Sequence, residues 1–181
     1  MTRARPNPRP LTAQRLEELA LAYVARFATS AAKLEGYLRR KLRERGWEGD
    51  GEAPVAALVS RFVANGYVDD EAFARARTGS LLRRGYGARR IAQALSAAGI
   101  DETLRAATRA GQGEQRRAAL ALAQKRRFGP FGAELPDRPQ RERQLAAMLR
   151  AGHPLDSARE LVNAADIDAA LAWAEAQDED E

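Results

Sequence analysis

Three clusters of arginine and lysine hold the side chains best suited to chemistry in this chain, and that chemistry is anion binding. Arginine can fork onto a phosphate or a carboxylate, and phosphate contacts need cations held at the surface. The clusters are Arg39, Arg40, Lys41 and Arg43; Arg83, Arg84, Arg89 and Arg90; and Lys125, Arg126 and Arg127. We predict that they bind a polyanion, although each cluster alone could equally be a solvated helix face. Tyr86, between two of these arginines, is expected to pack inward, with stacking on a base as the alternative.

The charge balance of the chain also favours a polyanionic partner. The 30 arginines and lysines exceed the 25 acids, which gives a net charge of +5 and a pI of about 10.1. Five acids lie within residues 175–181, and without them the body carries about +10. A body this basic favours nucleic acid, or a complex that contains it, as the partner. Only three of the cations are lysine, so a GC-rich genome is the alternative explanation.

The remaining polar motifs do not combine into a catalytic or metal site. Asp69 and Asp70 are neighbours, and side chains at i and i+1 of a helix do not converge as an acid–base pair; they fit the stabilisation of a helix start. His153 is the only histidine and there is no cysteine, so a metal would lack ligands. The Gly85-x-Gly87 turn lacks the preceding strand and the lysine of a phosphate loop. We expect no enzyme, no cofactor and no metal.

The elements that must position the basic clusters are helices. Apolar residues recur at three- and four-residue steps, and no stretch alternates with a period of two. Thr29 or Ser30 and Asp156 are the expected N-caps of two of these helices. The sequence predicts helices at about residues 14–27, 31–45, 54–65, 69–84, 88–98, 102–110, 114–128, 140–151, 157–165 and 167–173.

The middle helices repeat one pattern that ends in glycine. Leu38, Leu42 and Gly46 match Ile91, Leu95 and Gly99 in spacing, whereas a third copy fits only with a slip, through Met148 and Gly152. A glycine followed by an apolar residue is typical of a helix end whose tail folds back. A helical period of about 45–50 residues indicates an array of small units. We predict an all-α fold, a tandem array of three three-helix, helix-turn-helix-like repeats that is elongated and curved.

The composition sets the expected boundaries. Residues 1–13 alternate arginine with proline and are expected to be a disordered basic arm. The three repeats are placed at 14–68, 69–112 and 113–173, followed by an acidic tail at 174–181. No apolar run approaches the roughly 18 residues of a membrane span, and the N-terminus lacks the apolar region of a secretory signal. We expect a cytoplasmic monomer with no membrane attachment.

Two motifs resemble the RecX family of regulatory proteins. One is Gly66-Tyr67-Val68-Asp69-Asp70-x-x-Phe73-Ala74, and the other is Gly87-x-x-Arg90-Ile91-x-x-x-Leu95-x-x-x-Gly99-Ile100. Residues 143–162 resemble that family's third repeat, and the likeness covers roughly residues 15–165. The resemblance implies a noncatalytic modulator of the RecA recombinase. Such a protein binds the filament of RecA on single-stranded DNA and restrains its growth, strand exchange and ATPase, and so regulates DNA repair.

Two other functions fit the same residues. A nucleic-acid-binding helical module would act without RecA, and a helical adaptor would bind another acidic protein. The acidic tail could also pair with the basic surface of the same chain and lower its nonspecific binding of DNA. The three functions separate by their effect on the RecA ATPase and by whether DNA affinity falls steeply with salt.

Overall fold

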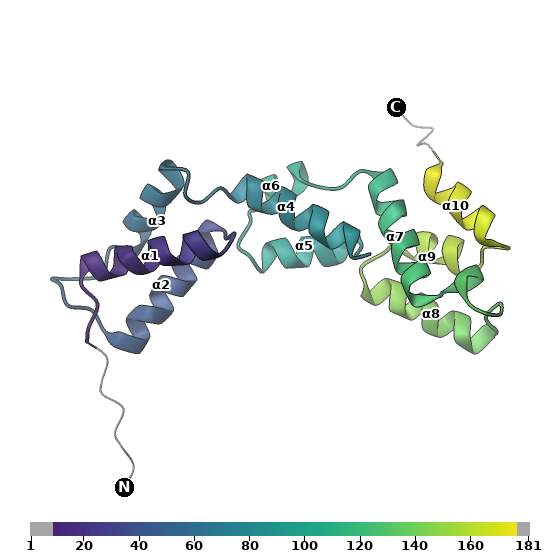
Figure 1. Ribbon diagram of the computed structural model, residues 1–181, viewed down its shortest axis with the longest axis horizontal. Coiled ribbons are helices and arrows are strands. Elements are labelled where there is room, and N and C mark those ends of the chain that lie inside the picture. The colour runs from purple at the N-terminus through teal and green to yellow at the C-terminus, as the bar shows by residue number, and fades with distance from the viewer. Residues whose placement is uncertain (1–8, 177–181) are drawn as a thin grey trace, which may run out of the picture. The chain divides into compact units, whose positions relative to one another are not determined.

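The computed structural model describes residues 9–176, and in this part of the chain the regular elements are all helices, apart from an isolated bridge between Leu11 and Trp47 (Figure 1). The prediction of an all-α fold is confirmed. Ten α-helices and one 3-10 turn cover the described residues. They are α1 (Ala13–Arg26), α2 (Ala31–Arg45), α3 (Val55–Ala64), α4 (Asp70–Arg83), α5 (Ala88–Ser96), α6 (Glu102–Ala107), α7 (Gln112–Arg126), η1 (Gly129–Phe131), α8 (Arg138–Arg150), α9 (Leu155–Val162) and α10 (Ile167–Glu175).

Short polar side chains cap many of these helices, which explains where they begin. The hydroxyl groups of Thr12 and Ser30 accept hydrogen bonds from backbone N–H groups in the first turns of α1 and α2. The carboxylate of Asp69 accepts from the N–H of Ala72 at the start of α4. The expected cap of α9 was wrong, because Pro154 holds the N-cap position and Asp156 lies inside the first turn, where its charge faces the positive helix end.

The chain divides into two compact units. The first consists of residues 1–73 together with 98–100, and the second of residues 74–97 together with 101–181. The turn that follows α5 therefore belongs to the first unit, whereas α5 itself belongs to the second.

In the first unit, α1, α2 and α3 enclose a core of leucines around Phe62. Leu11 is also fully buried in this core. Two backbone hydrogen bonds hold it there: its N–H donates to the carbonyl of Gly46 at 3.0 Å, and its carbonyl accepts from the N–H of Glu48 at 3.0 Å. The packed part of the chain therefore begins before residue 13, and the predicted arm of residues 1–13 is shorter than expected. Residues 1–8 of that arm lie outside the described residues.

In the second unit, α7, α8, α9 and α10 pack together (Figure 1). Met148 and Leu161 are fully buried, and the rest of this core is rich in alanine. The helix α10 packs on α7. It ends at Glu175, two residues beyond the predicted end at Trp173. The acidic residues 178–181 lie outside the described part of the chain.

The turn after α5 is attached to the start of α2, and we call this contact the first joint. The hydroxyl of Ser30 donates to the carbonyl of Ala98 at 2.5 Å, and the carboxylate of Asp70 accepts from the N–H of Ala31 at 2.8 Å. Gly99 has a φ of 75°, and a Cβ added there would lie 2.2 Å from the Cβ of Ala32. A glycine is needed at this position for both reasons.

The turn after α8 is attached in the same way to the start of α5, within the second unit, and we call this contact the second joint. The N–H of Gly87 donates to the carbonyl of Ala151 at 2.9 Å, and the N–H of Arg89 donates to the carbonyl of Gly152 at 3.2 Å. The buried ring of His153 donates through Nε2 to the carbonyl of Gly85 at 2.9 Å. The second joint thus brings the ends of α4 and α8 to the first turn of α5.

Candidate nucleic-acid interface

A hollow beside the second joint gathers five cations, and we call it the basic pocket. It has a volume of about 360 Å³, and no carboxylate lines it. Its cations come from the ends of four helices, and they are Arg84, Arg90, Lys125, Arg126 and Arg150. In residues 9–176 none of the five makes an ion pair with an acid. An anion entering this pocket would therefore meet cations that have no competing partner.

The helix ends explain why these cations can stand so close together. Lys125, Arg126 and Arg150 occupy the last turns of α7 and α8, where unpaired carbonyl groups carry a partial negative charge. Basic residues are stabilised there by a few tenths of a kcal/mol up to about 1 kcal/mol each. Arg90 lies in the first turn of α5, where the carbonyls of Ala151 and Gly152 already accept from the N–H groups of Gly87 and Arg89, so its side chain is what this turn offers to an anion.

Two aromatic rings complete the pocket. Tyr86 and Phe128 are half-buried and line it, and the guanidinium of Arg84 lies 5.4 Å from the centre of the Tyr86 ring. The Tyr86 ring is therefore partly packed against the protein, as expected, and partly exposed in the pocket. Cations beside aromatic faces are the combination that single-stranded nucleic acid requires, because phosphates pair with the cations and bases stack on the rings.

The structure separates arginines that are adjacent in the sequence. Arg84 lines the basic pocket, whereas Arg83 lines another hollow together with Glu114. Arg90 lines the basic pocket, but Arg89 does not. The Nη2 of Arg89 donates instead to the carbonyl of Leu149 at 2.8 Å. Arg127 follows α7 with a left-handed backbone and does not line it either. The predicted clusters of the second unit contribute four residues to this pocket.

The sequence interpretation missed the fifth cation. Arg150 is the last residue of α8, two positions before Gly152. A basic residue in the last turn of a predicted helix was the signal that could have found it, because the same position supplies Lys125 and Arg126 from α7.

The predicted cluster on α2 in the first unit is different, since acids of the same helix partly neutralise it. Arg39 pairs with Glu35 at 2.7 Å, and Lys41 pairs with Glu44 at 2.6 Å. Arg40 is 3.7 Å from the same Glu44. Such exposed pairs contribute little stability and are screened by salt, so these cations remain available at modest cost. Their role as a binding surface stays a prediction.

Two further findings concern other kinds of site. Among residues 9–176 there is no group of three or more histidine, cysteine or acidic side chains that could hold a metal ion. The same part of the chain contains no helix that is both long enough and apolar enough to cross a membrane.

Comparison with known proteins places these features in a family. The sequence model described as the second three-helix domain of RecX matches residues 69–108. A regulatory protein RecX from Myxococcus xanthus (strain DK1622) is 32% identical over 166 residues, which cover 87% of this chain and 89% of that protein. Another, from Xanthomonas axonopodis pv. citri (strain 306), is 36% identical over 123 residues, covering 67% of this chain and 72% of that protein.

A solved structure shares the fold. The crystal structure of RecX from Lactobacillus salivarius superposes with a TM-score of 0.65 at 16% identity, covering 83% of this chain and 94% of that chain. At this identity the likeness bears on the fold alone, and it supports the predicted architecture of three-helix repeats.

Proposed function

Because this chain belongs to the RecX family of regulatory proteins, we propose that it binds the filament that the RecA recombinase forms on single-stranded DNA and inhibits filament extension, strand exchange and ATP hydrolysis. The observation that carries the proposal furthest is the basic pocket, in which five cations that pair with no acid of residues 9–176 adjoin two aromatic rings. A nucleoprotein filament is a long anionic polymer, and it offers the DNA phosphates and acidic protein surface that such a pocket accepts. The site of action is then the cytoplasm, and single-stranded DNA is one of the contacted partners.

A second candidate function is supported by the same pocket. A helical module that binds nucleic acid without RecA would also need unpaired arginines and stacking rings. The two differ in stoichiometry. A regulator of the filament acts at amounts well below that of RecA, whereas a plain DNA-binding protein affects RecA only when it covers the DNA.

The test is a titration of the DNA-dependent ATPase of RecA with this chain and with two charge-reversed variants. Arg84→Glu alters the basic pocket, and Arg83→Glu makes the same change one residue earlier, outside it. We expect the unmodified chain and Arg83→Glu to inhibit at substoichiometric amounts. Arg84→Glu should need about tenfold more protein, because it places a negative charge among four cations that would contact phosphate.

Three outcomes separate the candidates. Inhibition only at amounts that coat the DNA favours the RecA-independent module. Equal loss of inhibition in both variants would mean that total charge, and not the basic pocket, drives binding. An unmodified chain that leaves the ATPase unchanged at every ratio would remove RecA regulation as its function.

A further inference from the structure

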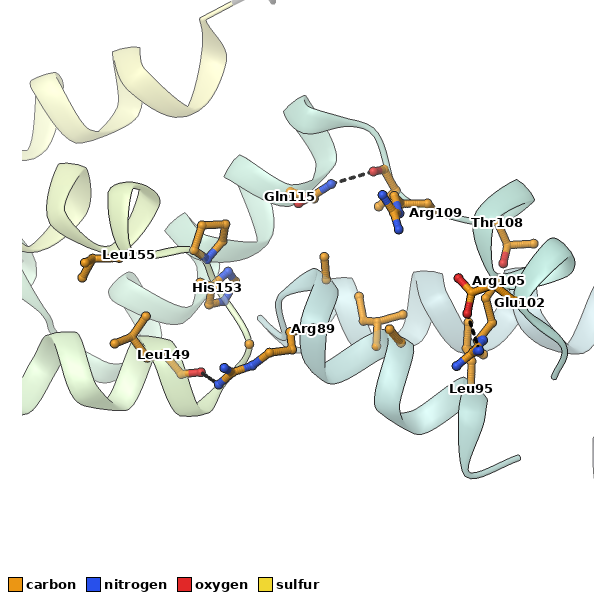
Figure 2. Close-up of a pocket in the computed structure, with 16 residues that line it drawn as sticks. Arg89, Leu95, Glu102, Arg105, Thr108, Arg109, Gln115, Leu149, His153 and Leu155 are labelled. Carbon is orange, nitrogen blue, oxygen red and sulfur yellow. Dashed lines mark hydrogen bonds and ion pairs between the residues drawn. The ribbon is translucent and has the colours of Figure 1, made fainter. Parts of the chain in front are cut away.

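A second hollow of the same unit has a different character, and we call it the apolar groove (Figure 2). Its volume is about 550 Å³, and it lies between α5 and α6 on one side and the turn from α8 to α9 on the other. Arg89 and Arg90 are consecutive residues of α5, but Arg89 lines the apolar groove and Arg90 lines the basic pocket. The helix α5 therefore separates two hollows that differ in chemistry.

Aliphatic side chains form the floor and one wall of the apolar groove. Ile91 and Leu95 are buried at its base, while Leu149, Pro154 and Leu155 line the side formed by α8 and α9. Leu155 remains 38% exposed, so part of its side chain is accessible in the groove. Covering such surface is favourable by about 25 cal/mol per Å², so an apolar side chain from a ligand would be held here.

Three arginines surround this floor, and a single acid accompanies them. Arg105 pairs with Glu102, three residues earlier on α6 (Figure 2), and the Nε–H of Arg105 is buried without an acceptor. Arg89 uses one nitrogen on the carbonyl of Leu149, which leaves its other donors free. The guanidinium of Arg109 has no hydrogen bond or ion pair within the described residues. The rim thus carries an excess of two positive charges, which attracts carboxylates.

We propose that the apolar groove binds a protein segment that carries apolar side chains flanked by acidic ones. Nucleic acid fits this groove less well for two reasons. The groove has no aromatic ring apart from that of His153, so it offers no stacking surface for a base. The carboxylate of Glu102 at its edge repels a phosphate backbone, whereas a peptide carboxylate can exchange with it for Arg105. This site goes beyond the proposed function, which needs only cations for phosphates and carboxylates, because it adds a surface that takes apolar side chains of a protein and does not require RecA.

The test uses a short fluorescent peptide with leucines on one helical face and glutamates beside them. Control peptides replace either the leucines by serines or the glutamates by glutamines. Fluorescence anisotropy with the full chain should show binding of the first peptide, and affinity should drop about tenfold for each control, since both apolar burial and charge pairing are needed.

Two variants of the chain, with a third as control, locate the binding. Ala92 is exposed and lines the groove, so Ala92→Phe would fill it without touching the core. Arg109→Glu reverses the charge of the free guanidinium, and Arg141→Glu makes the same change on an exposed residue of α8 outside the groove. We expect about tenfold weaker peptide binding by Ala92→Phe, about fivefold by Arg109→Glu and no change by Arg141→Glu. Circular dichroism verifies that each variant is folded.

Several results would overturn this assignment. One is the absence of peptide binding by the unmodified chain, and another is equal binding by all three variants. A third is that single-stranded DNA displaces the peptide and itself binds about tenfold less tightly to Ala92→Phe, which would make the groove part of the nucleic-acid interface. The outcome does not depend on RecA, so failure of the RecA proposal leaves this test intact.

Discussion

The first and second joints make the same connection with different groups. In both, the glycine turn after one middle helix packs on the N-terminus of the preceding middle helix. The carbonyl before the glycine accepts a hydrogen bond from the N-cap residue in each case. At the first joint the donor is the hydroxyl of Ser30, whereas at the second it is the backbone N–H of Gly87.

The joints also differ in what lies against the glycine. A Cβ at Gly99 would meet the Cβ of Ala32, which is a side chain that substitution can remove. A Cβ at Gly152 would lie 2.5 Å from the backbone nitrogen of Arg90, and a Cβ at Gly87 would lie 2.4 Å from the carbonyl carbon of Gly152. The second joint is therefore backbone against backbone, and no neighbouring substitution can make room there. It should tolerate change less than the first.

The largest effect is expected for Gly152→Ala. Its φ of 97° strains any other residue, and the added Cβ collides with the start of α5. We expect a loss of at least about 3 kcal/mol in the free energy of unfolding of the second unit, with no recovery on adding Arg90→Gly. Urea unfolding followed by circular dichroism measures it.

Gly66→Ala is the matched control for Gly152→Ala. Gly66 has a φ of 74° but nothing within 4 Å of an added Cβ, so it isolates the backbone strain. Its cost should be about 1 kcal/mol. Equal costs for the two substitutions would mean that the collision at the second joint does not matter.

The first joint should show an intermediate effect that a second substitution reverses. Gly99→Ala is expected to cost about 2–4 kcal/mol, from a φ of 75° and from contact with Ala32. Ala32→Gly should destabilise the unmodified chain by up to about 1 kcal/mol but stabilise the Gly99→Ala variant. The double-mutant cycle measures this change of sign. Additive effects would contradict a direct collision at this joint.

The smallest effect concerns the pH dependence of the second joint. Burial lowers the pKa of His153 below its ordinary value of about 6.5. Below that pH the unfolded chain binds a proton that the folded chain does not, so stability is complete above pH 6.5 and falls as the pH decreases.

Stability should fall between pH 7.0 and pH 5.5, by no more than about 1 kcal/mol. Thermal unfolding at both pH values, for the chain and for His153→Gln, measures it, because no other histidine is present. A variant with an undiminished pH dependence would show that His153 is not responsible. The first joint contains no histidine, so the comparison between the joints predicts no such dependence for the first unit.

Local patterns were sufficient for most of the fold. The bounds of α2 are those predicted, and Ser30 caps it as one of the two residues expected. Positive φ at Gly46, Gly66, Gly99 and Gly152 agrees with the predicted glycine stops. These features depend on neighbours within a few residues, so the sequence contains all that is needed to recognise them.

The slip in the third copy of the repeat has a physical reason. The position that holds Leu38 in α2 and Ile91 in α5 holds Gln144 in α8. Its side-chain oxygen accepts a hydrogen bond from the N–H of Gly129 at 2.8 Å. In α8 a hydrogen bond from a polar side chain thus replaces the apolar packing made at this position in α2 and α5. The spacing of apolar residues could not reveal this position, because the residue that fills it is polar and its partner lies in η1, outside the helix.

The sequence by itself determined the helices, their glycine ends and the excess of arginine, because helix propensity, capping and charge act over short distances along the chain. Only the tertiary structure decided which arginines converge. It placed Arg84 and Arg90 in the basic pocket while turning their neighbours Arg83 and Arg89 elsewhere, since successive side chains of a helix point about 100° apart and a pocket needs several helix ends at once.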